Sequence, residues 1–185
     1  AAATEAVKHV VDENTLVCSY QNGLGNFEII AEAVGRERAF GARVIYGARI
    51  VQPGHADVTV IANPTALGPY QYGPYAERIQ TIVEAMDDAG LPTVYTDKIE
   101  TVLWSKVAYN CALNPMSALL DVPYGKVGEV EDTKAIIHDI IHELYAVGKA
   151  HRVILEPDTP EAYLEHFFAN LLPPTAQHYA SMRED

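Results

Sequence analysis

Residues 15–34, "TLVCSYQNGLGNFEIIAEAV", contain the pattern that decides the fold class. The apolar, β-branched run at 15–20 predicts a buried strand, and the spacing of apolar residues at 27–34 predicts a helix. Between them lies "QNGLGN", a glycine-rich loop at 21–26. A strand, a glycine-rich loop and a helix in this order are typical of an α/β unit with a parallel sheet.

The patterns on the C-terminal side of this unit divide the chain into two parts. Further strands are predicted at 42–51 and 56–63, around a Pro53-Gly54 turn, and at 93–96, with a helix at 75–90 before the last of them. Beyond about residue 97 strand patterns disappear, and helical patterns follow at 99–120, 132–152 and 159–171. The sequence therefore predicts part of an α/β domain at 1–97 and an all-helical domain at 98–185.

Composition excludes several classes of protein. The chain has 185 residues, 49% of them apolar, which is enough for packed cores. Its 13 Lys and Arg against 25 Asp and Glu give a net charge of −12, which argues against a nucleic-acid partner. No run approaches the roughly 20 apolar residues of a membrane span. Cys18 and Cys111 lie far apart and form no CxxC pair, so we expect two free thiols and a cytoplasmic location.

Residues 103–115, "LWSKVAYNCALNP", place three polar side chains on one stripe of an otherwise apolar helix. Lys106, Asn110 and Asn114 are four residues apart, and four residues turn an α-helix by about 400°. An unpaired polar group on a buried helix costs a few kcal/mol, so these side chains need partners. Either the ammonium polarises a ligand's carbonyl while the amides hold its other polar groups, or the stripe is a solvated face or bridges to another helix. The pattern leaves both interpretations open.

The glycine-rich loop is a second candidate site. Ligands of open α/β sheets bind beyond the carboxyl ends of the strands, so Asn22, Gly23 and Gly25 are candidate cofactor contacts. The alternative is an ordinary turn, in which the glycines only provide positive φ angles. No GxGxxG or Walker loop occurs in the chain. His138 and His142 have the i, i+4 spacing of a metal-binding pair, but no third ligand is evident, and we predict no metal site.

Several segments, in the same order along the chain, resemble the ketopantoate reductase (2-dehydropantoate 2-reductase) family. They are "QNGLGNFE", Gly41, Pro53-Gly54, "LG" at 67–68, "LWSKVAYNCALNPMSAL" and "SM" at 181–182. The resemblance implies an NADPH-dependent oxidoreductase with a Rossmann domain for the cofactor and a helical domain that closes the cleft. Hydride would pass to the C2 ketone of ketopantoate, giving pantoate for coenzyme A synthesis.

The resemblance also implies roles for individual residues. Lys106 corresponds to the family's catalytic lysine, and Asn110 and Asn114 to its substrate-binding asparagines. Asn22 corresponds to the asparagine near nicotinamide and substrate, and Ser181 to the serine that contacts the substrate carboxylate. The implied partner is a small 2-oxo acid, without nucleic acid or membrane, and a homodimer is compatible with the resemblance.

The chain departs from the family pattern at several points. The family's GxGxxG loop and its catalytic glutamate are absent, so we expect the chain to be truncated at both ends. Tyr124 precedes Gly125 where many relatives have Asn, and His178 replaces an Asn often found before the "SM" pair. These two residues favour, as an alternative, a related NAD(P)-dependent 2-oxo acid dehydrogenase. A non-catalytic binding or assembly module is the remaining alternative, if the gene encodes only this segment.

Overall fold

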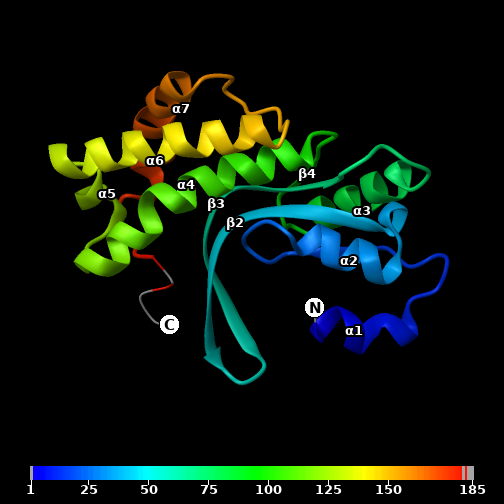
Figure 1. Cartoon of the computed structure of the whole chain (residues 1–185). Coiled ribbons are helices and arrows are strands. Elements are labelled where there is room, and N and C mark those ends of the chain that lie inside the picture. The colour runs from blue at the N-terminus through cyan, green and yellow to red at the C-terminus, as the bar shows by residue number, and fades with distance from the viewer. Residues whose placement is uncertain (1, 181, 183–185) are drawn as a thin grey trace. The chain divides into compact units, whose positions relative to one another are not determined.

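A computed structural model describes residues 2–180 and 182 of the chain (Figure 1). The chain divides into two compact units, Ala1–Leu103 and Trp104–Asp185. The division falls inside the long helix α4, Ile99–Leu120, rather than before it. The α/β character of the first unit and the helical character of the second agree with the predicted fold class.

The first unit is built on a four-stranded mixed sheet with the order β1-β2-β3-β4. β1 pairs with β2 in parallel, β2 with β3 antiparallel, and β3 with β4 in parallel. The strands are β1 Val17–Ser19, β2 Ala39–Gln52, β3 His55–Pro69 and β4 Thr93–Tyr95. β3 extends into residues 67–69, beyond the strand predicted at 56–63, although Gly68 and Pro69 are residue types typical of a loop. Leu67 is fully buried and pairs with Tyr95, so packing keeps this segment extended.

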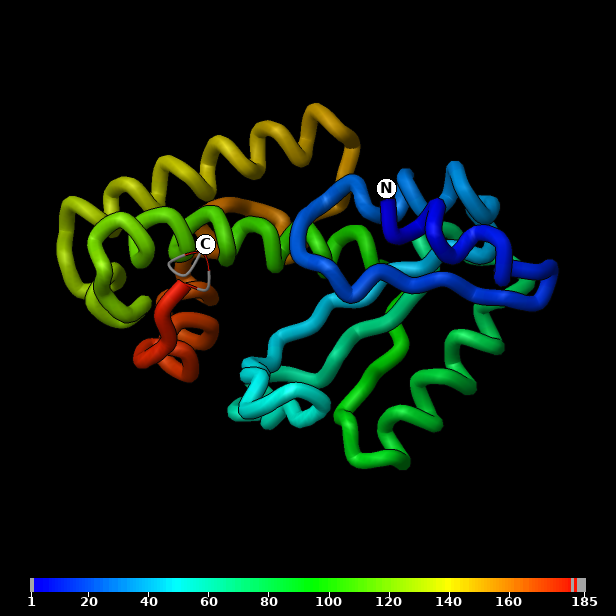
Figure 2. The backbone as a smooth tube through the Cα atoms, turned by 90° about the horizontal axis from the view of Figure 1, so that it is seen from below, coloured from blue at the N-terminus to red at the C-terminus, as the bar shows by residue number. Residues whose placement is uncertain are grey.

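Helices cover both faces of this sheet (Figure 2). Side chains alternate along β2, so Ala39 packs with α2, Asn26–Val34, while Phe40 and Ala42 pack with α3, Ala76–Asp88. The sheet therefore has one apolar core on each face. The short helix α1, Ala2–Val7, and 3₁₀ turns at Lys8–Val10 and Arg36–Arg38 complete the unit.

The β2–β3 hairpin continues past both neighbouring strands as a two-stranded ribbon (Figures 1 and 2). β1 pairs with β2 only at residues 39–41, and β4 pairs with β3 only at residues 65–67. The hairpin turns at the predicted Pro53-Gly54, where Gly54 has a φ of 81°. A positive φ at the second central residue fits the type II turn that this dipeptide favours.

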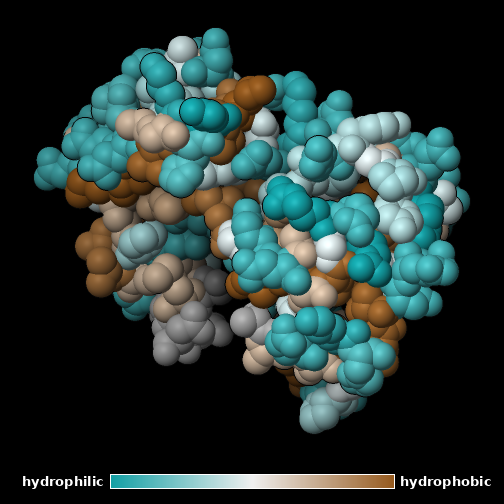
Figure 3. All heavy atoms as spheres, turned by 45° about the vertical axis from the view of Figure 1, so that its right-hand side comes forward, coloured by the Kyte–Doolittle hydropathy of each residue, from teal (hydrophilic) through white to brown (hydrophobic). Residues whose placement is uncertain are grey.

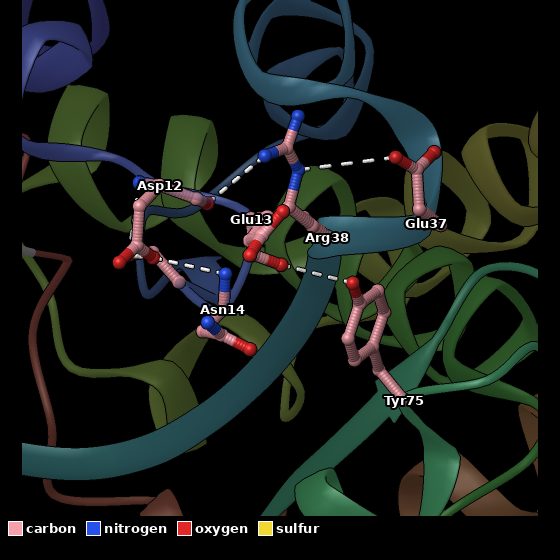
Figure 4. A network of polar contacts seen from close by, with 7 residues as sticks. Asp12, Glu13, Asn14, Glu37, Arg38 and Tyr75 are labelled. Atoms are coloured by element: carbon pink, nitrogen blue, oxygen red, sulfur yellow. Dashed lines mark hydrogen bonds and ion pairs between the residues drawn. The ribbon is translucent and has the colours of Figure 1, made fainter.

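Side chains from distant segments fix the chain just before β1 (Figure 4). Each donates a hydrogen bond to a backbone carbonyl oxygen of residues 12–14. The bonds run from Arg38 to Asp12 at 2.9 Å, from Tyr75 to Glu13 at 3.0 Å and from Arg78 to Asn14 at 2.7 Å. These bonds hold the entry to β1, and with it the position at which the glycine-rich loop leaves the sheet.

The second unit is helical. After α4 follow α5 Tyr124–Val127, α6 Glu131–Ala150 and α7 Pro160–His166, then a π-helical turn Phe167–Leu171 and a 3₁₀ turn Pro173–Thr175. One core joins α4 through Ala112 and Leu113 to α6 through Ile137 and Ile141, and to Phe167. Figure 1 shows α4 and α6 side by side.

Local chemistry explains where these helices match the predictions and where they differ. Thr159 caps α7 by accepting a 3.2 Å hydrogen bond from the Ala162 amide, and Pro160 occupies the first helical position, so the helix begins where the sequence pattern at 159–171 begins. Pro115 lies inside α4 without breaking it. Between the helices predicted at 99–120 and 132–152 lies a further short helix, α5, whose residues Tyr124 and Val127 are buried in the core.

Polar side chains cover most of the face shown in Figure 3, and apolar side chains reach the surface in patches. Some exposed apolar residues belong to the β2–β3 ribbon, among them Ile50 with 83% of its surface exposed. Among the described helices, none combines the length and apolar character required to cross a bilayer.

Candidate functional site

The glycine-rich loop leaves the carboxyl end of β1 and enters α2. Gly23 and Gly25 have φ angles of 91° and 87°, and a Cβ atom on either would meet nothing within 4 Å. Both glycines are therefore needed for backbone conformation, and their backbone faces open space. The Asn26 side chain braces the loop by donating to the carbonyl oxygens of Asn22, at 3.3 Å, and Gly23, at 3.5 Å. Asn22 itself is exposed.

A cavity lies at this same edge of the sheet. Its lining includes Ser19 and Gln21 at the end of β1, Gly23 in the loop, Gly41 of β2 and the stacked rings of Phe27 and Tyr70, whose centroids are 3.8 Å apart. Of the three predicted loop contacts, Gly23 lines the cavity, whereas Asn22 and Gly25 flank it in the loop. The position beyond the end of a parallel strand is where α/β proteins bind ligands.

The structure keeps the polar stripe on one side of α4. Lys106, Asn110 and Asn114 are all half-buried, and Ala108 and Ala112, on the opposite side of the helix, are fully buried. No hydrogen bond from the Asn110 side chain to another residue is found within 2–180 and 182. The Asn110 amide is therefore left to solvent or to a ligand.

Asn114 has an internal partner. The Tyr124 hydroxyl donates a hydrogen bond of 2.7 Å to its Oδ1. Tyr124 is buried in α5, and its ring meets that of Tyr109 edge to face, with centroids 6.0 Å apart. Burial raises the pKa of Tyr124, which keeps its hydroxyl protonated as a donor. The carbonyl end of Asn114 is thus occupied, and its NH₂ end makes no hydrogen bond to the residues that the structure describes.

The two residues that depart from the family pattern meet in the structure. The Tyr124 amide donates to the carbonyl oxygen of His178 at 2.9 Å, and the Gly125 amide donates to that of Ala176 at 2.9 Å. The segment before "SM" therefore runs alongside the start of α5. Ser181, predicted to contact the substrate carboxylate, lies outside the described residues.

The other buried phenols near α4 serve the core. The hydroxyl of Tyr163 donates to the Ser105 carbonyl oxygen at 2.9 Å, and that of Tyr109 pairs with the Thr175 hydroxyl. Burial raises the pKa of Tyr109 to about 12, and that of Tyr163 is raised for the same reason. Neither phenol ionises near neutral pH, so we assign both to structure.

The histidine pair on α6 forms a surface cluster. The rings of His138 and His142 stack with centroids 4.2 Å apart, and Nε2 of His142 lies 3.4 Å from Oε1 of Glu161. Within the described part of the chain, no group of three or more His, Cys, Asp or Glu side chains is placed to hold a metal ion. Both cysteines are free thiols, as predicted, with Cys18 half-buried and Cys111 exposed.

The fold matches solved structures over the whole chain. A D-mandelate dehydrogenase solved with NADH and anilino(oxo)acetate superposes with a TM-score of 0.85 at 19% identity, covering 100% of this chain and 58% of that one. A PanE/ApbA family ketopantoate reductase from Ralstonia eutropha JMP134 gives 0.81 at 24% identity, covering 100% and 57%. At these identities the matches establish the fold: a Rossmann-like part followed by a helical domain.

Sequence comparison is more specific. The family model described as ketopantoate reductase PanE/ApbA matches residues 1–72, and that of its C-terminal domain matches residues 98–185. The 2-dehydropantoate 2-reductase of Aquifex aeolicus is 35% identical over 183 residues, covering 99% of this chain and 59% of the relative. That of Pyrococcus horikoshii is 28% identical, covering 99% and 58%. The chain thus spans about three fifths of the length of these curated relatives. Two models of one family, matching most of the chain between them, show that it belongs to the ketopantoate reductase (PanE/ApbA) family.

Proposed function

We propose that the full-length protein reduces ketopantoate to pantoate with NADPH. The observation that carries this proposal is the Lys106, Asn110 and Asn114 stripe, half-buried on α4 within the segment that the family's C-terminal model matches. The named relatives are 2-dehydropantoate 2-reductases, and the fold is shared with an NADH-bound dehydrogenase of known structure. Each of these supports a nicotinamide-dependent reduction of a 2-oxo acid.

The loop and cavity of the first unit suit a dinucleotide. Gly23 and Gly25 leave open space above their backbone, and the cavity beside Gly23 combines polar groups with the aromatic wall of Phe27 and Tyr70. We assign the contacts to the nicotinamide end of the cofactor to this loop, with Asn22 as the polar side chain next to Gly23. A bound NADPH supplies the hydride.

The residues of α4 supply the remaining chemistry. Reduction of a ketone places negative charge on its oxygen, and the Lys106 ammonium can stabilise that charge and donate the proton. The Asn110 amide, which has no partner in the described part of the chain, is available to hold the substrate's hydroxyl group. Asn114 would donate through its NH₂ end, because Tyr124 occupies its Oδ1. Fixing the substrate in this way supplies the orientation that hydride transfer requires.

Tyr124 favours a second candidate, a dehydrogenase for another 2-oxo acid in the same family. The Tyr124 phenol bonded to Asn114 stands where many relatives have an amide, so the contacts that this end of the stripe offers a substrate would differ from those of these relatives. The reaction, the cofactor and the roles of Lys106, Asn110 and Asn22 are the same in both candidates.

Steady-state kinetics of the full-length gene product separate these candidates. Oxidation of NADPH and of NADH is followed with ketopantoate, with an aliphatic 2-oxo acid and with an aromatic one. A kcat/KM for ketopantoate that exceeds the others supports the first proposal, and a preference for another 2-oxo acid supports the second. Absence of turnover with every pair, together with absence of NADPH binding, would favour a non-catalytic binding module.

A further inference from the structure

Two amide side chains border the cavity at the end of β1, one from each end of the glycine-rich loop. Gln21 begins the loop, Asn26 is the first residue of α2, and both line the cavity together with Gly23. Apart from these residues the lining consists of Ser19, Gly41 and apolar or aromatic side chains. Every lining residue belongs to the first unit.

The side-chain amide of Asn26 is held with its nitrogen turned towards the loop. Nδ2 donates to the carbonyl oxygens of Asn22 and Gly23, at 3.3 and 3.5 Å. Only the NH₂ end of an amide can donate, so both contacts select the same orientation. Oδ1 of Asn26 makes no hydrogen bond to residues 2–180 and 182. Asn26 therefore brings an unpaired acceptor to the border of the cavity.

The side-chain amide of Gln21 is held the other way round. The Ser19 hydroxyl accepts a 3.3 Å hydrogen bond from the Gln21 backbone amide, and it donates one of 3.5 Å to Oε1 of Gln21. The carbonyl end of this side chain is thus engaged, and its NH₂ end has no hydrogen bond within the described part of the chain. The same cavity is bordered by an unpaired donor from Gln21 and an unpaired acceptor from Asn26.

A donor next to an acceptor is complementary to a neutral amide, which carries both kinds of group on one planar unit. A carboxylate or an ionised phosphate oxygen only accepts, so it would leave the Asn26 oxygen without a partner. The chain's net charge of −12 does not attract an anion either. The nicotinamide of a dinucleotide carries a carboxamide on a flat ring, and the stacked rings of Phe27 and Tyr70 line the same cavity.

We infer that Gln21 and Asn26 bind the carboxamide of the nicotinamide ring. Gln21 donates to the carbonyl oxygen of this group, and Asn26 accepts from its NH₂. The inference rests on the proposed function and adds two cofactor-binding residues to it. Holding the carboxamide limits rotation of the ring, which supports the orientation that hydride transfer requires. The edge of adenine also has an NH₂ donor beside an acceptor nitrogen, so the experiment has to distinguish the two ends of the cofactor.

The test measures dissociation constants of the full-length protein by calorimetry, which does not require turnover. The ligands are NADP⁺, its 3-acetylpyridine analogue and adenosine 2′,5′-bisphosphate, or the corresponding NAD⁺ series if the enzyme prefers NADH. The analogue replaces only the carboxamide NH₂ by a methyl group, and the bisphosphate carries adenine without nicotinamide. The variants are Gln21→Met and Asn26→Ala. Gln52→Met is the matched control, because Gln52 is exposed beside the hairpin turn and does not line the cavity.

The two variants should respond differently to the analogue. Gln21→Met should weaken binding of NADP⁺ and of the analogue alike, by about 2- to 10-fold, the usual worth of a neutral hydrogen bond, because both ligands keep the carbonyl oxygen. Its affinity for the bisphosphate should not change. The wild type should bind NADP⁺ more tightly than the analogue by a similar factor, whereas Asn26→Ala should bind the two equally. This ratio isolates the carboxamide contact, since loss of the loop contacts of Asn26 weakens both ligands. Gln52→Met should behave as wild type.

Three results would overturn the inference and leave the proposed function standing. A wild-type ratio of NADP⁺ to analogue affinity in Asn26→Ala would reduce Asn26 to a brace of the loop. Wild-type affinities in Gln21→Met would leave Gln21 without a role in binding. Weaker binding of the bisphosphate by Gln21→Met would assign the pair to the adenine. If the wild-type protein bound neither NADP⁺ nor NAD⁺, the proposed function itself would fail, and the inference with it.

Discussion

The hydroxyl of Tyr124 donates a 2.7 Å hydrogen bond to Oδ1 of Asn114, which joins α5 to the polar stripe of α4. Free rotation of the amide would let Asn114 present either end to a ligand. The bond to Tyr124 selects the NH₂ end, because a hydroxyl that stays protonated offers a hydrogen to the carbonyl oxygen. Tyr124, which departs from the family pattern, thus orients Asn114, which matches that pattern.

Tyr124→Phe should separate this orienting role from packing. The variant keeps the ring and its edge-to-face contact with Tyr109 but loses the hydrogen bond. We expect a loss of about 1 kcal/mol in the free energy of unfolding and a rise in the KM for the substrate of roughly tenfold at most. Denaturant unfolding and steady-state kinetics measure the two effects.

Tyr109→Phe is the control, because the Tyr109 hydroxyl pairs with Thr175 and not with the stripe. It should lower stability by a similar amount and leave the KM unchanged. Equal KM values for the wild type and Tyr124→Phe would show that the Asn114 orientation does not matter for binding.

Much of the fold follows from local sequence signals. Alternating apolar residues locate β2 and β3, the glycine-rich loop locates the end of β1, and Thr159-Pro160 locates the start of α7. Local signals do not reveal the structure of segments that packing decides. Leu67-Gly68-Pro69 has the composition of a loop, yet burial of Leu67 and pairing with β4 keep it in β3.

The candidate site shows the same division. The four-residue steps of Lys106, Asn110 and Asn114 follow from helix geometry and are visible in the sequence. The hydrogen bond from Tyr124 to Asn114 is not visible in the sequence, because it joins two different helices. The turn between these helices is closed by the Ser117 hydroxyl, which donates to the Val122 carbonyl oxygen.

The close approach of β3 to the segment after β4 predicts a strongly destabilising substitution. A Cβ atom at Gly68 would lie 1.9 Å from the Thr96 carbonyl oxygen, next to the hydrogen bond from the Thr96 amide to the Leu67 carbonyl. Gly68→Ala should therefore lower the free energy of unfolding by about 1–3 kcal/mol or more. Gly73→Ala is the control, since its Cβ would meet only Gln71, at 3.8 Å. Equal melting temperatures for the two variants would contradict this account.

The two thiols should differ in reactivity. Burial raises the pKa of Cys18 to about 12. Cys111 is exposed, and partial burial of its thiol also raises its pKa. Because the thiolate is the reactive form, iodoacetamide at pH 8 should label Cys111 first and Cys18 only slowly. Mass spectrometry of timed samples measures both rates, and Cys111→Ser removes the fast phase. Faster labelling of Cys18 in the folded protein would show that β1 opens readily.

Lys106→Ala tests whether the polar stripe is catalytic or structural. A positioned proton donor contributes about 10²- to 10⁴-fold to a rate, so kcat of the full-length enzyme should fall by that factor. Lys106→Gln should be almost as slow, because an amide keeps a hydrogen-bond donor but neither the charge nor a transferable proton. NADPH affinity, followed by the fluorescence of the reduced nicotinamide, should change little, since we assign cofactor contacts to the loop of the first unit. Asn110→Ala provides the comparison on the same helix face, and it should mainly raise the KM.

If Lys106→Ala retained normal turnover while its melting temperature fell, the lysine would be structural. The stripe on α4 would then be a polar seam between helices, and the catalytic assignment would be lost.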